Sequence, residues 1–513
     1  MSVRVGKTAT APAFPIAAGG ALEDSQLRRN VKHATEVIRA KRGRVVEEAA
    51  DWEQLRQAGH DIKAHTLRHL DQYLQQFEAN CERAGGKVHW ARDADEANSI
   101  ILGLLRGYQA TEVIKVKTMT SDEIGLNRAL EAAKIEPVET DLADMIIQLG
   151  ADEPSHIVVP ALHKNRAEIR EIFLDKMGLD HLGTEATDLT DAARHYLREK
   201  FLRVEIGLSG ANFAIADTGG VCVVESEGNG RMCLTLPDVL ITLVGIEKVI
   251  PGFQDLEVYL QTLPRSATGE RMNPYNSIWT GVHAGDGPQH FHVVLLDNGR
   301  TEMLANDLER ETLDCIRCGA CLNACPVYRE TGGHAYGSIY SGPIGAILSP
   351  QLQSMEHSRS LPYASSLCGA CYEVCPVKIN IPELLIHLRG KVVRADQSTL
   401  AGALNPESLA MKFASRAFQS TSVYVAAQRL ARLGQAPFVR KGMIGPLPGM
   451  FGGWTKFRDL KAIPKRSFRD WWKDHEKARQ KSGGAGPVRS ATNASDASRR
   501  AASSETKEGA SHG

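Results

Sequence analysis

Two cysteine-rich frames, which begin at positions 315 and 365, constrain this chain more than any other feature of its sequence. The first reads Cys315-Ile-Arg-Cys318-Gly-Ala-Cys321-Leu-Asn-Ala-Cys325-Pro326. Its short gaps let three thiolates from one tight loop reach three irons of a single cubane cluster, while the fourth cysteine, followed by proline, points away and typically binds a second cluster. The frame therefore predicts iron–sulfur binding.

The second frame repeats this spacing with one exception, because a serine stands where the first cysteine is expected. It reads Ser365-Ser-Leu-Cys368-Gly-Ala-Cys371-Tyr-Glu-Val-Cys375-Pro376. In paired frames of this kind, the last cysteine of each frame ligates the cluster that the other frame holds. The two frames therefore predict two clusters. The first would be held by Cys315, Cys318, Cys321 and Cys375, and the second by Cys325, Cys368 and Cys371.

The fourth ligand of the second cluster stays open at this point. Ser365 could supply an oxygen, which is a harder and poorer iron ligand than a thiolate, an external group could bind, or the place could have no ligand. We expect two [4Fe–4S] clusters, with [3Fe–4S] as the alternative for the second. Gly319 and Gly369 allow close approach of the backbone to a cluster, or simply a tight loop.

Zinc and disulfide bonds explain these cysteines less well. A zinc site needs only four ligands, and a three-residue gap followed by proline is not typical of zinc motifs. Disulfides would indicate secretion, but the first 20 residues contain no continuous apolar segment of the kind that a signal peptide needs. The sequence therefore predicts a cytoplasmic protein. We interpret the other cysteines, Cys81, Cys222 and Cys233, as buried structural thiols.

Charge and hydropathy exclude two classes of function. Lys and Arg total 61, and Asp and Glu also total 61, so the formal net charge is zero and no general nucleic-acid coat is indicated. The longest apolar run is Val239–Ile246, far shorter than the roughly 20 residues of a membrane span. We expect no nucleic-acid partner and no integral membrane segment.

The patterning divides the chain into six parts. Repeated alternation of strands and helices predicts an α/β domain with a mainly parallel sheet. Its predicted strands include His156–Pro160 and Met232–Leu236. The cysteine region, with helical segments around Ile344–Leu348 and Pro382–Leu388, predicts an all-α, helical ferredoxin-like domain. The parts are a flexible arm (1–22), N-terminal helices (23–86), the α/β domain (87–300), the two-cluster domain (301–390), a helical and then irregular region (391–480) and a disordered tail (481–513).

Three further features leave their interpretation open. No nucleotide-binding glycine motif is present, because Gly228-Asn-Gly230 lacks the third glycine. The polar segments Ser209–Asn212 and Asp217–Gly220, with Glu225, could form an anion or carboxylate pocket or could be turns that need glycine. A basic stretch beside aromatic residues could bind a partner or cap the helical region; it comprises Lys461, Lys465, Arg466, Phe468, Arg469, Trp471, Trp472 and Lys473.

The sequence resembles the lactate utilisation protein B family over about residues 20–475. The resemblance rests on the two cysteine frames, on Gly207-Leu-Ser-Gly-Ala-Asn-Phe-Ala-Ile-Ala-Asp-Thr-Gly-Gly-Val221, on Cys375-Pro-Val-Lys-Ile-Asn-Ile-Pro-Glu-Leu-Leu385 and on Phe468-Arg-Asp-Trp-Trp472. It implies a sugar-isomerase-like α/β fold, seven cluster cysteines, and a role beside two partner proteins in the oxidation of L-lactate to pyruvate.

We therefore expect an electron-transfer subunit of a lactate-oxidising complex that is not itself catalytic, whose electron acceptor the sequence does not indicate. Two alternatives remain. The α/β domain could bind a hydroxy acid near Gly207–Glu225 and act as the oxidoreductase itself, with an open iron of the second cluster. Alternatively, loss of the three-cysteine cluster could regulate partner binding, as in a redox sensor.

Overall fold

The computed structural model describes residues 11–353, 355–449, 452–455, 458 and 460–481. The chain divides into two compact units, one ending at Asp396 and the other beginning at Gln397. The predicted tail over 481–513 lies outside the described residues, apart from Lys481. Among the described helices, none is long and apolar enough to cross a membrane.

The first unit is built around a six-stranded sheet in which every pair of neighbours is parallel. Side chains alternate between its faces, so Ile114 and Val293 join one hydrophobic core while their chain neighbours Val113 and Val294 join another. This confirms the predicted parallel α/β domain. The strands, in spatial order, are β1 (Lys87–Ala91), β10 (His290–Leu296), β7 (Val239–Gly245), β4 (Ile206–Gly210), β2 (Glu112–Lys115) and β3 (Glu136–Glu139).

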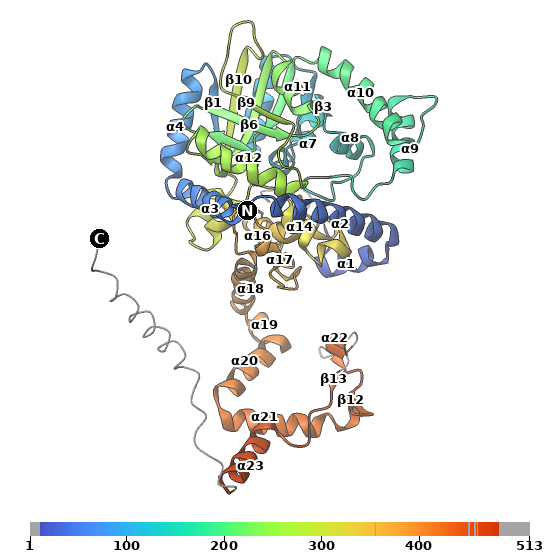
Figure 1. Ribbon diagram of the computed structural model, residues 1–513, viewed down its shortest axis with the longest axis vertical. Helices are drawn as coiled ribbons and strands as arrows, with labels where there is room; N and C mark the ends of the chain where they lie inside the picture. The colour runs from blue at the N-terminus through green and yellow to red at the C-terminus, as the bar shows by residue number, and fades with distance from the viewer. Residues whose placement is uncertain (1–10, 354, 450–451, 456–457, 459, 482–513) are drawn as a thin grey trace, which may run out of the picture. The chain divides into compact units, whose positions relative to one another are not determined.

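Amphipathic helices cover both faces of this sheet (Figure 1). Ile101 of one helix and Leu130 of another pack on one face, whereas Phe173 and Phe201 belong to the core on the other. Local capping fixes the helix starts, as at Asn165, which forms a reciprocal capping box with Glu168. These helices are α5 (Ala94–Gly107), α6 (Met119–Glu123), α7 (Leu126–Ala132), α8 (Leu142–Leu149), α9 (Arg166–Met177) and α10 (Ala186–Arg203).

The N-terminal part is helical from residue 14 onward, which corrects the prediction of a flexible arm over 1–22 for residues 14–22. Phe14 and Ala18 are buried, and Phe14 packs on Tyr336, so an apolar face orders this segment. Residues 1–10 lie outside the described part of the chain. The four helices are α1 (Phe14–Glu23), α2 (Ser25–Glu47), α3 (Trp52–Arg68) and α4 (Leu70–Arg83).

A second, mixed sheet forms a platform beside the first. In the chain, α12 (Phe253–Ala267) lies between its last two strands, and the Tyr259 ring of this helix stacks on Phe213 at 4.8 Å. In spatial order its strands are β8 (Val249–Ile250), β5 (Phe213–Ile215), β6 (Gly220–Glu225) and β9 (Tyr275–Trp279).

Two predicted strands were wrong. Met232–Leu236 was expected to return as a strand, but residues Asn229–Thr235 form helix α11, which starts after Gly228 in a left-handed conformation. His156–Pro160 is irregular, because the His156 ring accepts the backbone N–H groups of Val158 and Val159, which a strand would need for its ladder.

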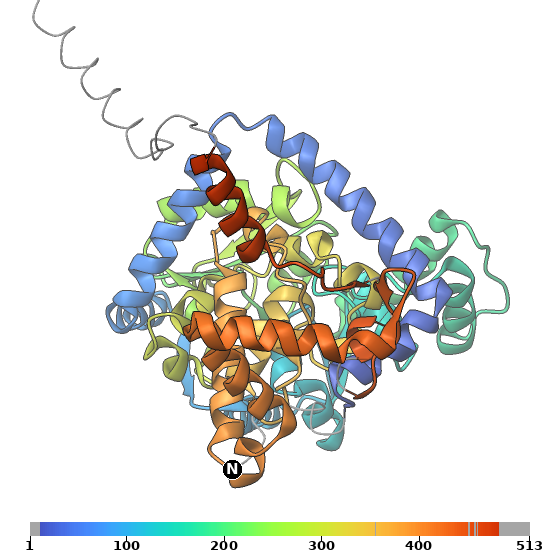
Figure 2. The same cartoon turned by 90° about the horizontal axis from the view of Figure 1, so that it is seen from below.

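The cysteine region packs on this platform. Ile316 and Leu322 share one hydrophobic core with Phe213 and Tyr259, and both views show the blue helix α2 near the yellow segment that it contacts (Figures 1 and 2). Described residues 301–396 contain helices and no strand. The elements are α13 (Arg300–Leu304), η2 (Glu309–Asp314), α14 (Ala320–Ala324), α15 (Tyr328–Thr331), η3 (His334–Tyr336), α16 (Gly342–Leu352), η4 (Leu361–Tyr363), α17 (Ala370–Glu373) and α18 (Ile381–Gln397).

The second unit contains several helices and a small antiparallel sheet of order β11-β12-β13. Aromatic side chains of the basic stretch contact one another at tilted angles and stay exposed, with Phe468 at 70% and Trp472 at 46%. The elements are α19 (Leu400–Ala403), α20 (Pro406–Gln419), α21 (Thr421–Gly434), η5 (Ala436–Phe438), β11 (Val439–Arg440), β12 (Met443–Ile444), α22 (Gly452–Thr455), β13 (Leu460–Lys461) and α23 (Phe468–Lys481).

Candidate iron–sulfur site

Each cysteine frame folds into a tight loop followed by a short helix. In the first, Arg317 (φ +61°) and Gly319 (φ +73°) turn the backbone in left-handed conformations before α14. In the second, Leu367 (φ +55°) and Gly369 (φ +84°) do the same before α17. Both loops therefore present their first three frame positions from one tight turn.

The structure brings the last cysteine of each frame to the other frame. Burial raises the pKa of Cys375, and the neighbouring charges of Cys318 and Cys315 raise it further. In the same way, the pKa of Cys371 is raised to about 12, first by burial and then by Cys325. Two groups of neighbouring thiols result, with Cys315, Cys318, Cys321 and Cys375 in one and Cys325, Cys368 and Cys371 in the other; they have the members of the predicted sets, whose role as ligands stays a prediction.

The two groups lie next to each other. Burial and the neighbouring Cys318 and Cys315 raise the pKa of Cys321, and the Cys371 thiol of the other group raises it further. All ten cysteines of the chain are free thiols. Six of the seven frame cysteines are buried or half-buried, and only Cys368 is exposed. The arrangement excludes a disulfide scaffold and leaves the thiols available as ligands.

Backbone amides point at three of the sulfur atoms. The N–H groups of Arg317, Tyr328 and Ile379 donate to the sulfurs of Cys315, Cys325 and Cys375 at 3.4, 3.5 and 3.4 Å. Such bonds stabilise a thiolate, which is the form that ligates iron. The buried sulfurs, the amide donors and the left-handed loops all fit iron–sulfur clusters.

Cationic side chains surround the first group. The Arg317 side chain is only 9% exposed; burial lowers its pKa, but the charge of Cys315 raises it above the usual value. It lies 4.8 Å over the Tyr340 ring and pairs with Glu247 at 3.3 Å. Lys248 is also buried, and its pKa is lowered to about 7 by burial and by the charge of Arg317. Lys63 and Arg42 also lie near this group. Burial lowers the pKa of each, and the charge of at least one frame cysteine raises it. These cations offset the negative charge that four thiolates would gather.

The second group has a different environment. Burial is the largest cause of the raised pKa of both Cys325 and Cys371. Cys368 and its neighbour Leu367 reach the surface, and Leu367 is 37% exposed. This group is the more accessible of the two.

An irregular segment of the α/β domain braces the first frame, which sequence reasoning did not find. His156 is buried, its Nε2 lies 3.2 Å from Asn323 Oδ1, and burial lowers its pKa to about 3. The Tyr328 hydroxyl donates to the backbone carbonyl of Ser155 at 2.7 Å. The cluster region is therefore tied to the sheet domain by hydrogen bonds as well as by apolar packing.

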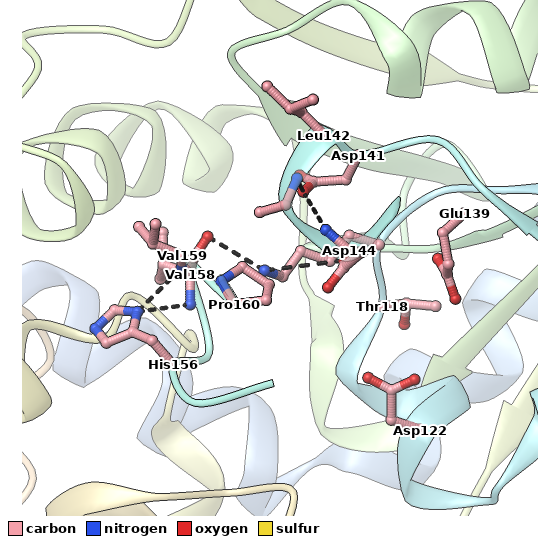
Figure 3. A network of polar contacts seen from close by, with 12 residues as sticks. Thr118, Asp122, Glu139, Asp141, Leu142, Asp144, His156, Val158, Val159 and Pro160 are labelled. Atoms are coloured by element: carbon pink, nitrogen blue, oxygen red, sulfur yellow. Dashed lines mark hydrogen bonds and ion pairs between the residues drawn. The ribbon is translucent and has the colours of Figure 1, made fainter. Parts of the chain in front are cut away.

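A cleft of about 690 Å³ lies at the carboxyl ends of strands β2 and β3, where ligands of parallel α/β sheets usually bind. Its floor is the buried ion pair of Lys115 with Glu139, and Figure 3 shows Glu139, Thr118 and Asp122 around this space. Sequence reasoning missed this pair, because two charged residues at strand ends read as solvent-facing. Its acidic lining comprises Asp122, Glu131, Glu139, Asp144, Asp152 and Glu153, against Lys115 and Arg128.

Most of the polar residues that could form an anion pocket make hydrogen bonds to neighbouring parts of the protein instead. Ser209 bonds Thr242 within the sheet at 2.8 Å, and Asn212 Oδ1 accepts the N–H of Val224. Glu225 accepts the N–H groups of Glu227 and Gly228 and so caps the start of α11. Cys81, Cys222 and Cys233 are fully buried in hydrophobic cores, in agreement with the structural role predicted for them.

Three further side chains of metal-ligating types lie where the α/β domain meets the cysteine region. The ligand atoms of Asp152, His163 and His334 lie within 4.8 Å of one another. They already have protein partners, since His163 bonds Asp152 and Ser155, and Lys164 pairs with Asp152. Hydrogen bonding within the protein accounts for this group.

Fold and cysteines together define an iron–sulfur protein built on a parallel α/β domain. Three family patterns match consecutive parts of the chain: LUD domain at residues 74–296, 4Fe-4S dicluster domain at 311–379, and Lactate utilisation protein B, C-terminal at 391–477.

Full-length relatives agree with these matches. "Lactate utilization protein B" of Oceanobacillus iheyensis is 42% identical over 465 residues, which is 90% of this chain and 96% of the relative. The protein of the same name from Bacillus thuringiensis is 41% identical over 466 residues, covering 90% and 97%. This chain belongs to the lactate utilization protein B family.

One solved structure also matches, a DUF162 family protein from Deinococcus radiodurans. It is 15% identical, covers 44% of this chain and 98% of its own, and has a TM-score of 0.26. A TM-score that low says nothing about a shared fold.

Proposed function

We propose that this protein is the electron-transferring subunit of a system that oxidises L-lactate to pyruvate. The observation that carries the proposal is the exchange of Cys375 and Cys325 between the two loops, which joins two ligand groups in one compact unit. An iron–sulfur cluster supplies one-electron redox chemistry when it is bound. The relatives are named for lactate utilization, so we infer that the redox chemistry serves the oxidation of lactate.

The residues of this chain have distinct tasks in the proposal. Cys315, Cys318, Cys321 and Cys375 would hold one [4Fe–4S] cluster, and Cys325, Cys368 and Cys371 would hold the other. Apolar packing around Ile316 and Leu322 excludes water from the first site. Arg317, Lys248 and Lys63 balance its charge, while the exposed Cys368 leaves the second site close to an external donor or acceptor.

Chemistry on lactate itself belongs to a partner in this proposal. One-electron carriers do not take a hydride, so a second protein is needed for the substrate step. The cleft in the α/β domain supports this division, because acidic side chains outnumber basic ones in its lining even without Asp144, whose pKa burial raises well above its usual value, and such a lining disfavours a monoanionic hydroxy acid. The free thiols suit the cytoplasm, where such groups stay reduced.

The test is reduction of the clusters by L-lactate, followed by visible absorbance under anaerobic conditions. The purified chain alone should stay oxidised, and addition of the partner proteins of the system should bleach the clusters. Cys318→Ser should lose the signal of one cluster. Turnover of L-lactate by this chain alone, with an artificial acceptor, would contradict the carrier role.

A further inference from the structure

The loop around Ser365 copies the loop around Cys315. In the first loop, the Arg317 N–H donates to Cys315 Sγ at 3.4 Å, and in the second the Leu367 N–H donates to Ser365 Oγ at 3.1 Å. Arg317 and Leu367 both have positive φ, +61° and +55°, although neither is a glycine. The side-chain oxygen of Ser365 is therefore held by the same local bond as the sulfur of Cys315.

The copy continues through the short helices that follow. Leu322 donates to the Gly319 carbonyl at 3.0 Å, and Tyr372 donates to the Gly369 carbonyl at 2.9 Å. The last cysteine of each frame then donates its N–H to the carbonyl three residues before it, at 3.1 and 3.2 Å. Because these backbone bonds repeat from the first frame position to the last, we infer that Ser365 stands toward Cys368 and Cys371 as Cys315 stands toward Cys318 and Cys321.

We propose that Ser365 Oγ is the fourth protein ligand of the cluster held by Cys325, Cys368 and Cys371. The inference rests on the cluster assignment of the proposed function. Ligation exchanges the O–H bond of the serine for an O–Fe bond, and the hydroxyl proton leaves to solvent. Water can take this proton because Ser365 is only half-buried and the adjacent Ser366 is exposed.

Arg389 of helix α18 is the positioning residue for this loop. Its guanidinium donates to the Ser365 carbonyl at 3.4 Å and to the Pro362 carbonyl at 2.8 Å. It also lies 5.1 Å over the Tyr363 ring. These contacts hold the backbone of Ser365 in place and put a positive charge beside an anionic ligand, the task that Arg317 has at the first group.

Full-length protein purified without oxygen provides the test, with Ser365→Ala, Ser365→Cys and, as a matched control one residue away, Ser366→Ala. Iron and sulfide content, EPR and Mössbauer spectra are the measurements. Wild type and S366A should hold about eight irons per chain. S365A should lose about one iron and show a [3Fe–4S] signal in the oxidised state, while S365C should keep about eight and survive air several-fold longer.

The proposal is overturned if S365A keeps about eight irons with an unchanged spectrum, because the fourth iron would then have another ligand. It is also overturned if the wild type itself holds about seven irons and already shows the oxidised [3Fe–4S] signal. Cys371→Ser separates the two levels of the argument. This variant should lose the second cluster whatever Ser365 does, so retention of both clusters in C371S would contradict the cluster assignment instead.

Discussion

The two cysteine groups share a backbone design but differ in the number of their cysteines and in access. The first has four cysteines, little exposure and a surrounding set of buried cations, including Arg317 and Lys248. The second has three cysteines and an exposed edge at Cys368. One loop design thus serves both an insulated site and an accessible one, and the side chains around the loop decide which it becomes.

The largest expected effect comes from substitution of the last cysteine of each frame, which in the proposed assignment ligates the cluster of the other loop. Cys375→Ser should remove about four irons and the same EPR signal that Cys318→Ser removes. Cys325→Ser should remove the signal that Cys371→Ser removes. If C375S instead abolishes the same signal as C371S, each loop binds its own cluster and the comparison fails.

The glycines of the two loops should respond unequally to alanine. Both have positive φ, which costs a substituted residue about 1–2 kcal/mol. A methyl group at Gly319 would also meet Val158 at 3.0 Å and the His156 ring at 3.3 Å, whereas Gly369 has open space around it. Gly319→Ala should therefore lower iron content far more than Gly369→Ala. Equal losses would show that the packing of His156 on the first loop has no effect.

Acid should unfold the α/β domain and release both clusters together, since they belong to one compact unit. His292 bonds His89 and Tyr108, and burial, followed by the charges of His89, Lys87 and His290, lowers its pKa to about 4. The unfolded chain binds this proton below about pH 6.5. Stability is therefore lost as the pH falls from about 6.5 to 4, by roughly 3 kcal/mol.

His292→Gln should remove part of this acid sensitivity, as measured by urea unfolding at pH 7 and pH 5, and buried His156, whose pKa is lowered to about 3, should account for a comparable part. The exposed His195 of helix α10 provides the control, and His195→Gln should keep the wild-type dependence. If cluster absorbance is lost at a different pH for each cluster, the two sites do not unfold as one.

Arg317 should tune the first cluster alone. Arg317→Met removes a buried positive charge beside Cys315, so the reduction potential of the first cluster should fall on the order of tens of millivolts. Arg317→Lys keeps the charge and should recover most of the difference. A potentiometric titration followed by EPR measures both clusters at once, and an equal shift of both would contradict separate environments.

Sequence patterns predict the cysteine sets and the parallel sheet because both depend on spacing. Cys315 to Cys325 is a local motif, and alternation of apolar strands and amphipathic helices follows periodicity. Placement of Lys63 and Lys248 beside Cys315 depends on segments far from it in the chain, so no local pattern indicates it.

Local conformation set by side chains was the other source of error. The ring of His156 takes the amides of a predicted strand, and Gly228 in a left-handed conformation starts a helix where a hairpin strand was expected. The Lys115–Glu139 pair at the floor of the cleft forms only because β2 and β3 lie in register. Local side-chain and glycine conformation decided the first two features, and tertiary pairing decided the third.

Iron and sulfide analysis with EPR on anaerobically purified wild-type protein, before and after reduction with dithionite, tests the central claim most directly. Two adjoining groups of cysteines predict about eight irons and eight sulfides per chain, with reduced signals that interact magnetically. About four irons, zinc in place of iron, or two reduced signals without interaction would contradict the account of two clusters shared between two loops.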